Sequence, residues 1–376
     1  MTYLLLSGIV SYTPNSDHQG AILKKKAIAF FPAHPSQIWM LRPVADELSK
    51  KYEILWFLRD KDVACSLAQR LGLRYEVLSK ASRGIIGNAW ELFLNIFKCI
   101  KLTLKYDIKC WVTKYGCGNI AARLLHRGSV SFSDDDIEII PLTAISSYPF
   151  ADVILAPAVV RMGKYRSKTK TYQSCHELFY LRPGRFTPSP EIYQHLGISP
   201  DQRYGLVRLS ALQAHHDVGI KGVSEAVLDQ LIQMTQPQIK IFITSEKSLE
   251  PRFEPYRLPI PVDRIFDALY YAEFLVSDSQ TMTSEAAVLG TPSFRLSDFV
   301  GRLSVIGQLE EAGISFGFKP HQADLLLQRL NAYLGDPEMQ RKVKTDHERF
   351  IASVPDAVPI FADAIDQVVL ARIGTK

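Results

Sequence analysis

The stretch VSDSQTMTSEAAVLGTP (residues 276–292) decides the fold, because a strand, a polar loop and a helix follow one another within it. An apolar run ends at Val276, and small polar residues follow over 277–281. A helical segment with a glutamate one turn in then ends at Gly290. This order is typical of a parallel sheet covered by helices. Ligands bind beyond the carboxyl ends of the strands in such sheets, which is where the polar loop would lie.

The start of this helix predicts an anion site. Backbone N–H groups and the positive end of the helix dipole lie at a helix N-terminus, and small residues let an anion come close. Glu285 lies about one turn further in, where its carboxylate can accept hydrogen bonds from the hydroxyls of a ribose. The pattern favours a nucleoside diphosphate. On the residues alone, the alternative is that Thr281 merely caps the helix and Glu285 is solvated.

Short apolar runs alternate with helical segments over most of the 376-residue chain, which is too long for one ordinary core. Runs such as AIAFF (27–31) and KCWVT (109–113) precede a Pro-, Gly- and Ser-rich stretch at 181–203. Runs such as YGLVRLS (204–210) and EFLVS (273–277) follow it. The sequence therefore predicts an α/β protein with two Rossmann-like domains facing a cleft.

The same pattern predicts the domain boundaries. We expect an N-terminal extension at 1–25, an N-terminal Rossmann-like domain at 26–185, a C-terminal domain at 186–353 and a helix that closes the fold at 354–376.

The composition is that of a soluble globular protein, with 47% hydrophobic and 22% charged residues and a net charge of +5. This mild positive charge suits an anionic substrate or an anionic membrane surface and does not argue for nucleic acid. The five cysteines are odd in number and form no C-x-x-C pair, which predicts a reduced, cytoplasmic chain without disulfides or a zinc site. Cys117 is either a reactive thiol or a packing residue.

One predicted helix, IIGNAWELFLNIFKCIKLTLK (85–105), is unusually apolar. Its polar residues recur three or four positions apart and form one narrow stripe, while Trp90, Phe93 and Phe97 lie outside that stripe. Such a helix is either wedged into a core or lies on a membrane surface beside anionic headgroups. No segment of the chain has the length and apolarity expected of a membrane-spanning helix.

A second polar segment, RLSALQAHHDVGIKG (208–222), supplies basic groups near the predicted anion site. The residues that suit a diphosphate in this segment are Arg208, His215, His216, Asp217 and Lys221. Adjacent His-His-Asp residues cannot easily wrap one ion, and the usual spaced partners are missing, so we infer no metal. The remaining alternative is structural, with a histidine bonded to a loop carbonyl.

The opening stretch resembles the nucleotide-sugar segment of glycosyltransferase-B-fold enzymes. Several segments, in order, also resemble a bacterial and archaeal family of undefined biochemistry that is grouped with this fold. They are AHPSQ, SDDDIE, YPFADVILAP, CHELFYL and AHHDVGIKG, and with the opening stretch they lie between about residues 27 and 350. Wider relatives include the N-acetylglucosaminyltransferase that makes lipid II and the non-hydrolysing UDP-N-acetylglucosamine 2-epimerases.

The resemblance implies that the C-terminal domain binds the donor nucleotide, with uridine as the expected base. Glu285 would hold the ribose, Ile265 and Phe266 would contact the base, and the loop at 297–299 would approach the donor sugar. The residues expected around the phosphates are Ser279, Gln280, Thr281 and Met282.

In the N-terminal domain, the resemblance implies a base that takes the proton of the acceptor hydroxyl. His34 follows the first strand and is one candidate, although lone histidines are often only structural. The other candidates are Asp134, Asp135 and Asp136, for which the alternative is a solvated turn or a helix cap. Relatives often carry a histidine or an acid where this chain has Gln37, and glutamine cannot act as a base.

Two glycines complete the predicted acceptor side. Gly116 and Gly118, in KYGCGN, are expected to allow a tight turn from strand to helix near the acceptor.

The leading interpretation is a glycosyltransferase that moves a sugar from a nucleotide diphosphate, most simply UDP, to a hydroxyl acceptor without a metal or other cofactor. The acceptor would be a glycan or a lipid-linked glycan of a cell-surface polysaccharide or glycolipid. The enzyme would then work at the inner face of the cell membrane, touching it through 85–105. One alternative is a nucleotide-sugar epimerase, which needs no acceptor. The other is a non-catalytic nucleotide-sugar-binding subunit, which the Gln37 departure supports.

Overall fold

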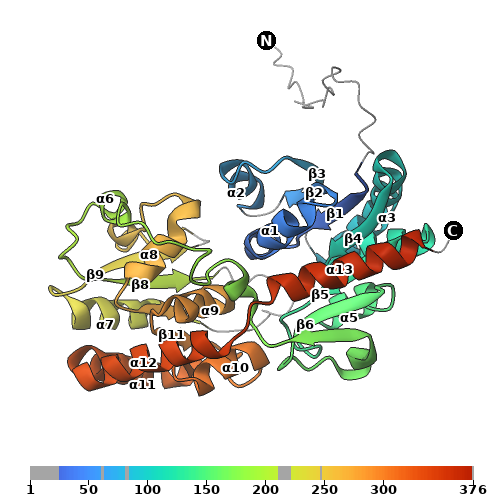
Figure 1. Ribbon diagram of the computed structural model, residues 1–376. Helices are drawn as coiled ribbons and strands as arrows, with labels where there is room; N and C mark the ends of the chain where they lie inside the picture. The colour runs from blue at the N-terminus through green and yellow to red at the C-terminus, as the bar shows by residue number, and fades with distance from the viewer. Residues whose placement is uncertain (1–24, 61–62, 81–83, 211–221, 246–247, 375–376) are drawn as a thin grey trace, which may run out of the picture.

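Two parallel β-sheets, one in each half of the chain, form the framework of the protein (Figure 1). The structure is a computed structural model that describes residues 25–60, 63–80, 84–210, 222–245 and 248–374. The first sheet has seven strands in the order β3-β2-β1-β4-β5-β6-β7, and the second has five in the order β12-β11-β10-β8-β9. All pairings between these strands are parallel, and helices flank both sheets. The predicted fold of two Rossmann-like α/β units is therefore confirmed.

The strands are short, as expected for parallel strands that are buried on both faces. In the first sheet they are β1 (Ala27–Phe31), β2 (Glu53–Asp60), β3 (Tyr75–Lys80), β4 (Ile108–Thr113), β5 (Gly128–Phe132), β6 (Val153–Pro157) and β7 (Thr169–Tyr172). In the second they are β8 (Tyr204–Leu209), β9 (Lys240–Ser245), β10 (Leu275–Ser277), β11 (Ser293–Leu296) and β12 (Ser315–Phe318).

The helices of the first half connect successive strands of the first sheet. They are α1 (Pro35–Ser49), α2 (Ala64–Arg70), α3 (Gly84–Tyr106), α4 (Gly116–Leu124) and α5 (Pro141–Ser147), with the 3-10 helices η1 (Gly163–Lys168) and η2 (His176–Phe179). The α-helices of the second half are α6 (Ile192–Leu196), α7 (Glu225–Thr235), α8 (Ile265–Tyr271), α9 (Gln280–Leu289), α10 (Ser304–Glu311), α11 (Ala323–Gly335), α12 (Pro337–Ser353) and α13 (Val358–Ile373). The short 3-10 turns of this half are η3 (Glu254–Tyr256), η4 (Val262–Arg264) and η5 (Pro320–Gln322).

The last helix ties the C-terminal end of the chain to the first sheet. Figure 1 shows α13, in red, running from the second half toward the strands of the first, where it packs on α1, β4 and β5. The hydroxyl of Tyr52 donates a 2.5 Å hydrogen bond to Asp366 of α13, and the Lys51 ammonium lies 2.9 Å from the same carboxylate. The chain thus returns to the half in which it began.

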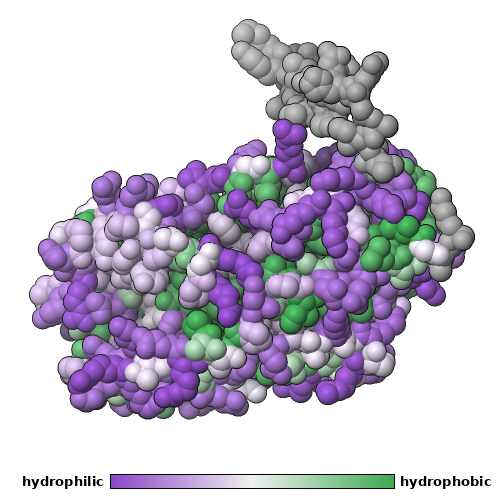
Figure 2. Space-filling view, in the orientation of Figure 1, coloured by the Kyte–Doolittle hydropathy of each residue, from purple (hydrophilic) through white to green (hydrophobic). Residues whose placement is uncertain are grey.

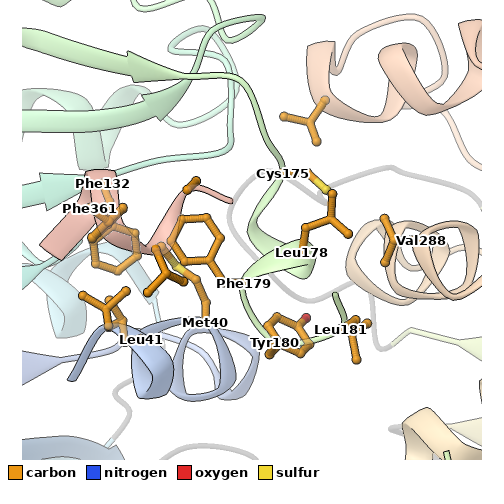
Figure 3. Close-up of a cluster of buried hydrophobic side chains, with 14 of the residues drawn as sticks. Met40, Leu41, Phe132, Cys175, Leu178, Phe179, Tyr180, Leu181, Val288 and Phe361 are labelled. Carbon is orange, nitrogen blue, oxygen red and sulfur yellow. The ribbon is translucent and has the colours of Figure 1, made fainter. Parts of the chain in front are cut away.

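The two halves also meet around a buried segment that follows β7. Phe179, at the end of η2, packs edge-on against Phe361 of α13, with ring centroids 5.5 Å apart. Figure 3 shows Phe179 beside Met40 of α1, with Leu178 on the side that faces Val288 of α9. This segment therefore contributes to the hydrophobic core of both halves, and it carries polar residues into the junction between them.

The room beside two glycines of the second half offers a test of how tightly its core is packed. A Cβ at Gly205 of β8 would lie 2.3 Å from the buried ring of Phe274, whereas a Cβ at Gly307 of α10 would touch nothing within 4 Å. We expect Gly205→Ala to lower the free energy of unfolding by about 2–3 kcal/mol through overpacking. The matched control, Gly307→Ala, should raise it by about 0.5–1 kcal/mol, because alanine favours a helix. Urea denaturation measures both, and equal effects of the two variants would contradict the packing described here.

Candidate functional site

The topology places the predicted residues of both halves where parallel sheets bind ligands. Strand order reverses between β1 and β4 in the first sheet and between β8 and β10 in the second. Ligands bind beyond the carboxyl ends of strands at such points. His34 and Lys114 follow β1 and β4, and Arg208 and Ser279 lie at the ends of β8 and β10. The candidate site is built from these four strand ends and the segment at η2.

An ion-paired cluster forms the N-terminal side of the site. The Lys114 ammonium lies 2.6 Å from Asp135 and 3.4 Å from Asp134, and the other oxygen of Asp134 lies 3.3 Å from Nδ1 of His176. Loss of water around Asp134 would raise its pKa, but His176 and Lys114 outweigh this effect and hold the pKa well below its usual range. Asp134 is therefore a weak proton acceptor that is well suited to orient an imidazole.

His176 and Glu177 are site residues to which the sequence analysis assigned no role. Both side chains are buried, and among the described residues His176 Nε2 and Glu177 Oε2 have no hydrogen-bond partner. Burial and, to a smaller extent, the nearby charge of Asp134 raise the pKa of Glu177 to about 7. The motif CHELFYL could have indicated these residues, since a His-Glu pair inside an apolar run needs hydrogen-bonding or charged partners once it is buried.

Glu285 reaches the same cluster from the C-terminal half. It is 6% exposed, and its Oε1 accepts a 2.8 Å hydrogen bond from the hydroxyl of Tyr180, just after η2. Burial raises the pKa of Glu285 to about 7, although Tyr180 and Arg208 pull in the opposite direction. The charge of Glu285 in turn raises the pKa of Glu177. The interpretation of Glu285 as a solvated residue is therefore wrong.

The loop before Glu285 has the geometry expected of a helix N-terminus. Ser279 is the N-cap of α9, and its hydroxyl accepts a 3.4 Å hydrogen bond from the N–H of Met282. The cap is thus Ser279 and not Thr281. Gln280 and Thr281 are half-buried in the first turn of the helix. The four residues predicted around the phosphates therefore lie together at the carboxyl end of β10.

Arg208 stands beside this loop. Its Nη1 donates a 3.2 Å hydrogen bond to Thr244, and its charge partly offsets the burial that raises the pKa values of both Glu285 and Asp278. Asp278 accepts a 2.7 Å hydrogen bond from the N–H of Ser210 and so fixes the loop that follows β8. His215, His216, Asp217 and Lys221, the other predicted donor-side residues, lie outside the described residues.

His34 and Gln37 hold the turn between β1 and α1. His34 is the exposed N-cap of α1, and its Nδ1 lies 2.9 Å from the Ser36 hydroxyl and 3.3 Å from the Ser36 N–H. Gln37 is buried and accepts a 2.7 Å hydrogen bond from the N–H of Ala33. His34 can act as a base through Nε2 only when Nδ1 is protonated, which requires the ring to give up the hydrogen bond that Nδ1 accepts from the Ser36 N–H.

Asp136 belongs to the junction between the halves and not to proton transfer. Its carboxylate accepts hydrogen bonds of 2.8 Å from both the N–H and the hydroxyl of Ser304, and one of 2.7 Å from the N–H of Arg161. Since Ser304 opens α10, Asp136 caps a helix of the other half. In the loop predicted to approach the donor sugar, Phe299 packs in a small apolar cluster with Ile139. Asp136 is therefore excluded as the base.

The predicted base-contacting residues differ in their surroundings. Phe266 is buried at the junction, with its ring centroid 5.1 Å from that of Trp39 and 5.3 Å from that of Tyr180. Ile265 is half-buried at the first position of α8. Phe266 therefore helps to join the two halves, and Ile265 is the more open of the two.

Gly116 and Gly118 make close packing possible at the start of α4. A Cβ at Gly116 would lie 2.2 Å from the carbonyl oxygen of Ser146, and one at Gly118 would lie 2.8 Å from Thr113. The predicted tight turn between β4 and α4 is present, but the glycines serve helix packing next to it. Cys117, between them, is buried, as a packing residue would be.

Comparison with known proteins supports the fold. No family model matches the chain, and no match was found among curated proteins. Among solved structures, UDP-GlcNAc 2-epimerase from Neisseria meningitidis bound to UDP-GlcNAc is similar over 91% of this chain and 100% of its own, with 12% identity and a TM-score of 0.67. MurG of Acinetobacter baumannii is similar over 91% of this chain and 99% of its own, with 12% identity and a TM-score of 0.57.

A third similar structure is a spinosyn glycosyltransferase. The rhamnosyltransferase SpnG complexed with thymidine diphosphate is similar over 90% of this chain and 99% of its own, with 12% identity and a TM-score of 0.59. The distant similarity to glycosyltransferase-B-fold proteins that the sequence indicates is thus confirmed for the fold. Membership in the family of undefined biochemistry stays a prediction.

The buried Glu177 predicts a specific dependence of stability on pH. Its pKa in the folded protein is about 7, above the ordinary 4.5. Between these two pH values the folded protein holds a proton on Glu177 that the unfolded chain has released. This group therefore lowers the free energy of unfolding as pH rises. Glutamine does not titrate, so the free energy of unfolding of Glu177→Gln does not fall in this way. The variant should be more stable than the wild type by about 3 kcal/mol near pH 8 and about equally stable near pH 4.5.

Urea denaturation of both proteins across this pH range measures the difference. Glu285→Gln should deviate from the wild type in the same direction, because the same physical cause raises its pKa. Parallel curves for wild type and Glu177→Gln would mean that Glu177 is not held in its neutral form.

Proposed function

We propose that the protein is an enzyme that transfers a sugar from a nucleotide diphosphate, most simply UDP, to a hydroxyl acceptor such as a glycan or a lipid-linked glycan. One observation carries the proposal. Glu285 of the second half accepts a 2.8 Å hydrogen bond from Tyr180 of the first half, and it lies near enough to Arg208 to be attracted by it and near enough to Glu177 to be repelled. Similar folds in solved structures hold UDP-GlcNAc or thymidine diphosphate, which supports a nucleotide diphosphate as the ligand class.

The donor would bind along the start of α9. The N–H groups of the first turn and the guanidinium of Arg208 would face the diphosphate, and Glu285 would accept hydrogen bonds from the ribose. Glu285 now accepts a hydrogen bond from Tyr180, so the ribose would share or replace this donor. The half-buried Ile265 is the candidate contact for the base.

The transfer step would use His34 as the base. Nε2 would take the proton of the acceptor hydroxyl while that oxygen forms a bond to the anomeric carbon of the sugar, and the bond from this carbon to the diphosphate would break. The diphosphate gains negative charge as it leaves. Arg208 and the N-terminus of α9 would stabilise that charge.

Epimerisation of the nucleotide-sugar is a second candidate, and Glu177 favours it. Inversion at a carbon beside the anomeric centre removes and returns a carbon-bound proton, which requires an acid or base with a pKa near neutrality. Glu177 has such a pKa and a hydrogen-bonding atom without a partner among the described residues. In the transfer step described above, Glu177 exchanges no proton with the substrate.

Calorimetric titration with UDP, GDP, CDP, ADP and dTDP tests the donor site. We expect one nucleotide to bind, and Glu285→Gln to weaken that binding by about 1–3 kcal/mol, the scale of a buried hydrogen-bonding group left without its partner. Glu311→Gln, an exposed change on α10, is the matched control and should bind as the wild type does. Unchanged affinity in Glu285→Gln would reject Glu285 as the ribose ligand.

Turnover of the corresponding nucleotide-sugar distinguishes the reactions. With an acceptor present, His34→Ala should abolish transfer and leave nucleotide binding intact, since only the base is lost. Without an acceptor, incubation in D₂O followed by NMR should show no deuterium in the sugar. Deuterium incorporation would establish epimerisation instead, and nucleotide binding without either reaction would favour a non-catalytic binding subunit.

A further inference from the structure

Helix α3 has an unusual orientation, because it turns Glu91, Asn95 and Thr103 inward and leaves aromatic residues outward. Both oxygens of Glu91 accept hydrogen bonds from Arg59, at 2.7 and 2.6 Å, and the pair is largely buried. Asn95 is 5% exposed, and the buried hydroxyl of Thr103 accepts a 2.9 Å hydrogen bond from the indole of Trp111. These contacts fix which face of α3 lies on the sheet.

The outward face of α3 is apolar and aromatic. Trp90 is 62% exposed and Phe97 52%, and Phe93, Leu94 and Leu104 are also exposed. The ring centroids of Trp90 and Phe93 are 5.6 Å apart, and those of Phe93 and Phe97 are 5.0 Å apart, so the three rings form one continuous row. The interpretation of this helix as wedged into a core is therefore wrong.

Neighbouring elements also expose apolar side chains. Helix α4 packs on α3 and α5 packs on α4, and these helices expose Leu124, Leu142 and Ile145. Val77 of the edge strand β3 is also exposed. Figure 2 shows apolar surface, in green, at the end of the molecule where α3 and α13 lie in Figure 1. Exposed apolar surface of this extent marks an interaction site.

Basic side chains accompany the aromatic row. Lys98, Lys101 and Lys105 lie on α3 and are exposed, but the Lys98 ammonium donates a 2.8 Å hydrogen bond to the carbonyl of Leu78 in β3. Lys101 and Lys105 therefore supply the outward positive charge of α3, and α4 adds the exposed Arg123. The acidic groups beside them are Glu76, 4.0 Å from Lys105, and Asp107, which pairs with Lys109 and Arg127. The one acidic residue among the described side chains of α3 is Glu91, which faces inward. The outward face of α3 is therefore cationic as well as apolar.

We propose that this face, defined by Trp90, Phe93, Leu94, Phe97 and Leu104 with the lysines of α3, docks on an anionic membrane surface. Aromatic rings favour the boundary between headgroups and acyl chains, and long lysine side chains reach anionic headgroups from an apolar face. A second copy of the chain would bring the same lysines together, whereas an anionic bilayer complements them. The inference does not depend on the proposed function, because docking requires no turnover.

The docking is of the kind that lies on a membrane and does not cross it. Within the described residues, no helix is long and apolar enough to span a bilayer. Helix α3 packs on the sheet along its inward face, so only the outward face is available to lipid. A helix held in this way presents its aromatic row parallel to the membrane plane.

Vesicle flotation of the full chain tests the proposal. We expect wild type to float with phosphatidylcholine vesicles that contain about 30 mol% phosphatidylglycerol, and to float poorly with phosphatidylcholine alone. The triple variant W90S/F93S/F97S should partition about tenfold less or worse. The double variant K101Q/K105Q should bind the anionic vesicles less well, and its weak binding to phosphatidylcholine alone should not change. Added salt should have the same effect on the wild type, because salt screens the charges.

A matched control replaces exposed apolar residues elsewhere. Y270S/L325S changes side chains that are 44% and 49% exposed in the second half, and it should float as the wild type does. Circular dichroism and thermal unfolding check that each variant folds. Wild type that stays unbound to anionic vesicles, or a folded triple variant that binds equally, would overturn the proposal. So would sedimentation in which wild type is a dimer that does not bind lipid and the triple variant is a monomer.

Discussion

The proximity of carboxyl groups from both halves is the constraint on which the junction depends. Glu177 and Glu285 are buried and Asp134 lies at the edge of the same cluster, and an unpaired ionised carboxylate in a buried place costs several kcal/mol. Lys114 compensates Asp134, and Arg208 lies near Glu285. Burial raises the pKa values of Glu177 and Glu285 to about 7, so each glutamate is partly protonated near neutral pH and the negative charge at the junction is reduced. A structure that must hold these groups together needs its halves fixed relative to one another.

Other contacts between the two halves provide that fixation. Asp136 bonds to the first residue of α10, α13 packs back on the first sheet, and Phe266 joins Trp39 and Tyr180 in an aromatic cluster. None of these contacts uses Asp134, Glu177 or Glu285 except through Tyr180, which bonds Glu285. The junction is therefore stabilised largely by residues other than the acidic ones, which leaves the latter available for a ligand.

Local patterns could predict the framework, because β1, β4, β8 and the start of α9 each follow from a short run of adjacent residues. The edge strands β7 and β12 were missed, since TKTY is largely polar and SFGF is interrupted by a glycine. For the site, Glu285 could be placed on its helix, but its partner Tyr180 lies 105 positions away. Glu177 was missed because burial at a junction of two halves is not a local property. The inward turn of Glu91 depends equally on a distant residue, Arg59.

The charge balance of the site limits which ligands it can accept. A diphosphate would add negative charge beside two carboxyl groups whose pKa values are already raised to about 7. Among the described residues, the cations near these groups are Arg208 and Lys114. Lys114 is already paired with Asp134 and Asp135. The added negative charge would raise both pKa values further, and a glutamic acid that carries a proton can donate a hydrogen bond where a carboxylate cannot. The same burial that makes these residues costly in the empty site thus suits them to lie beside an anionic leaving group.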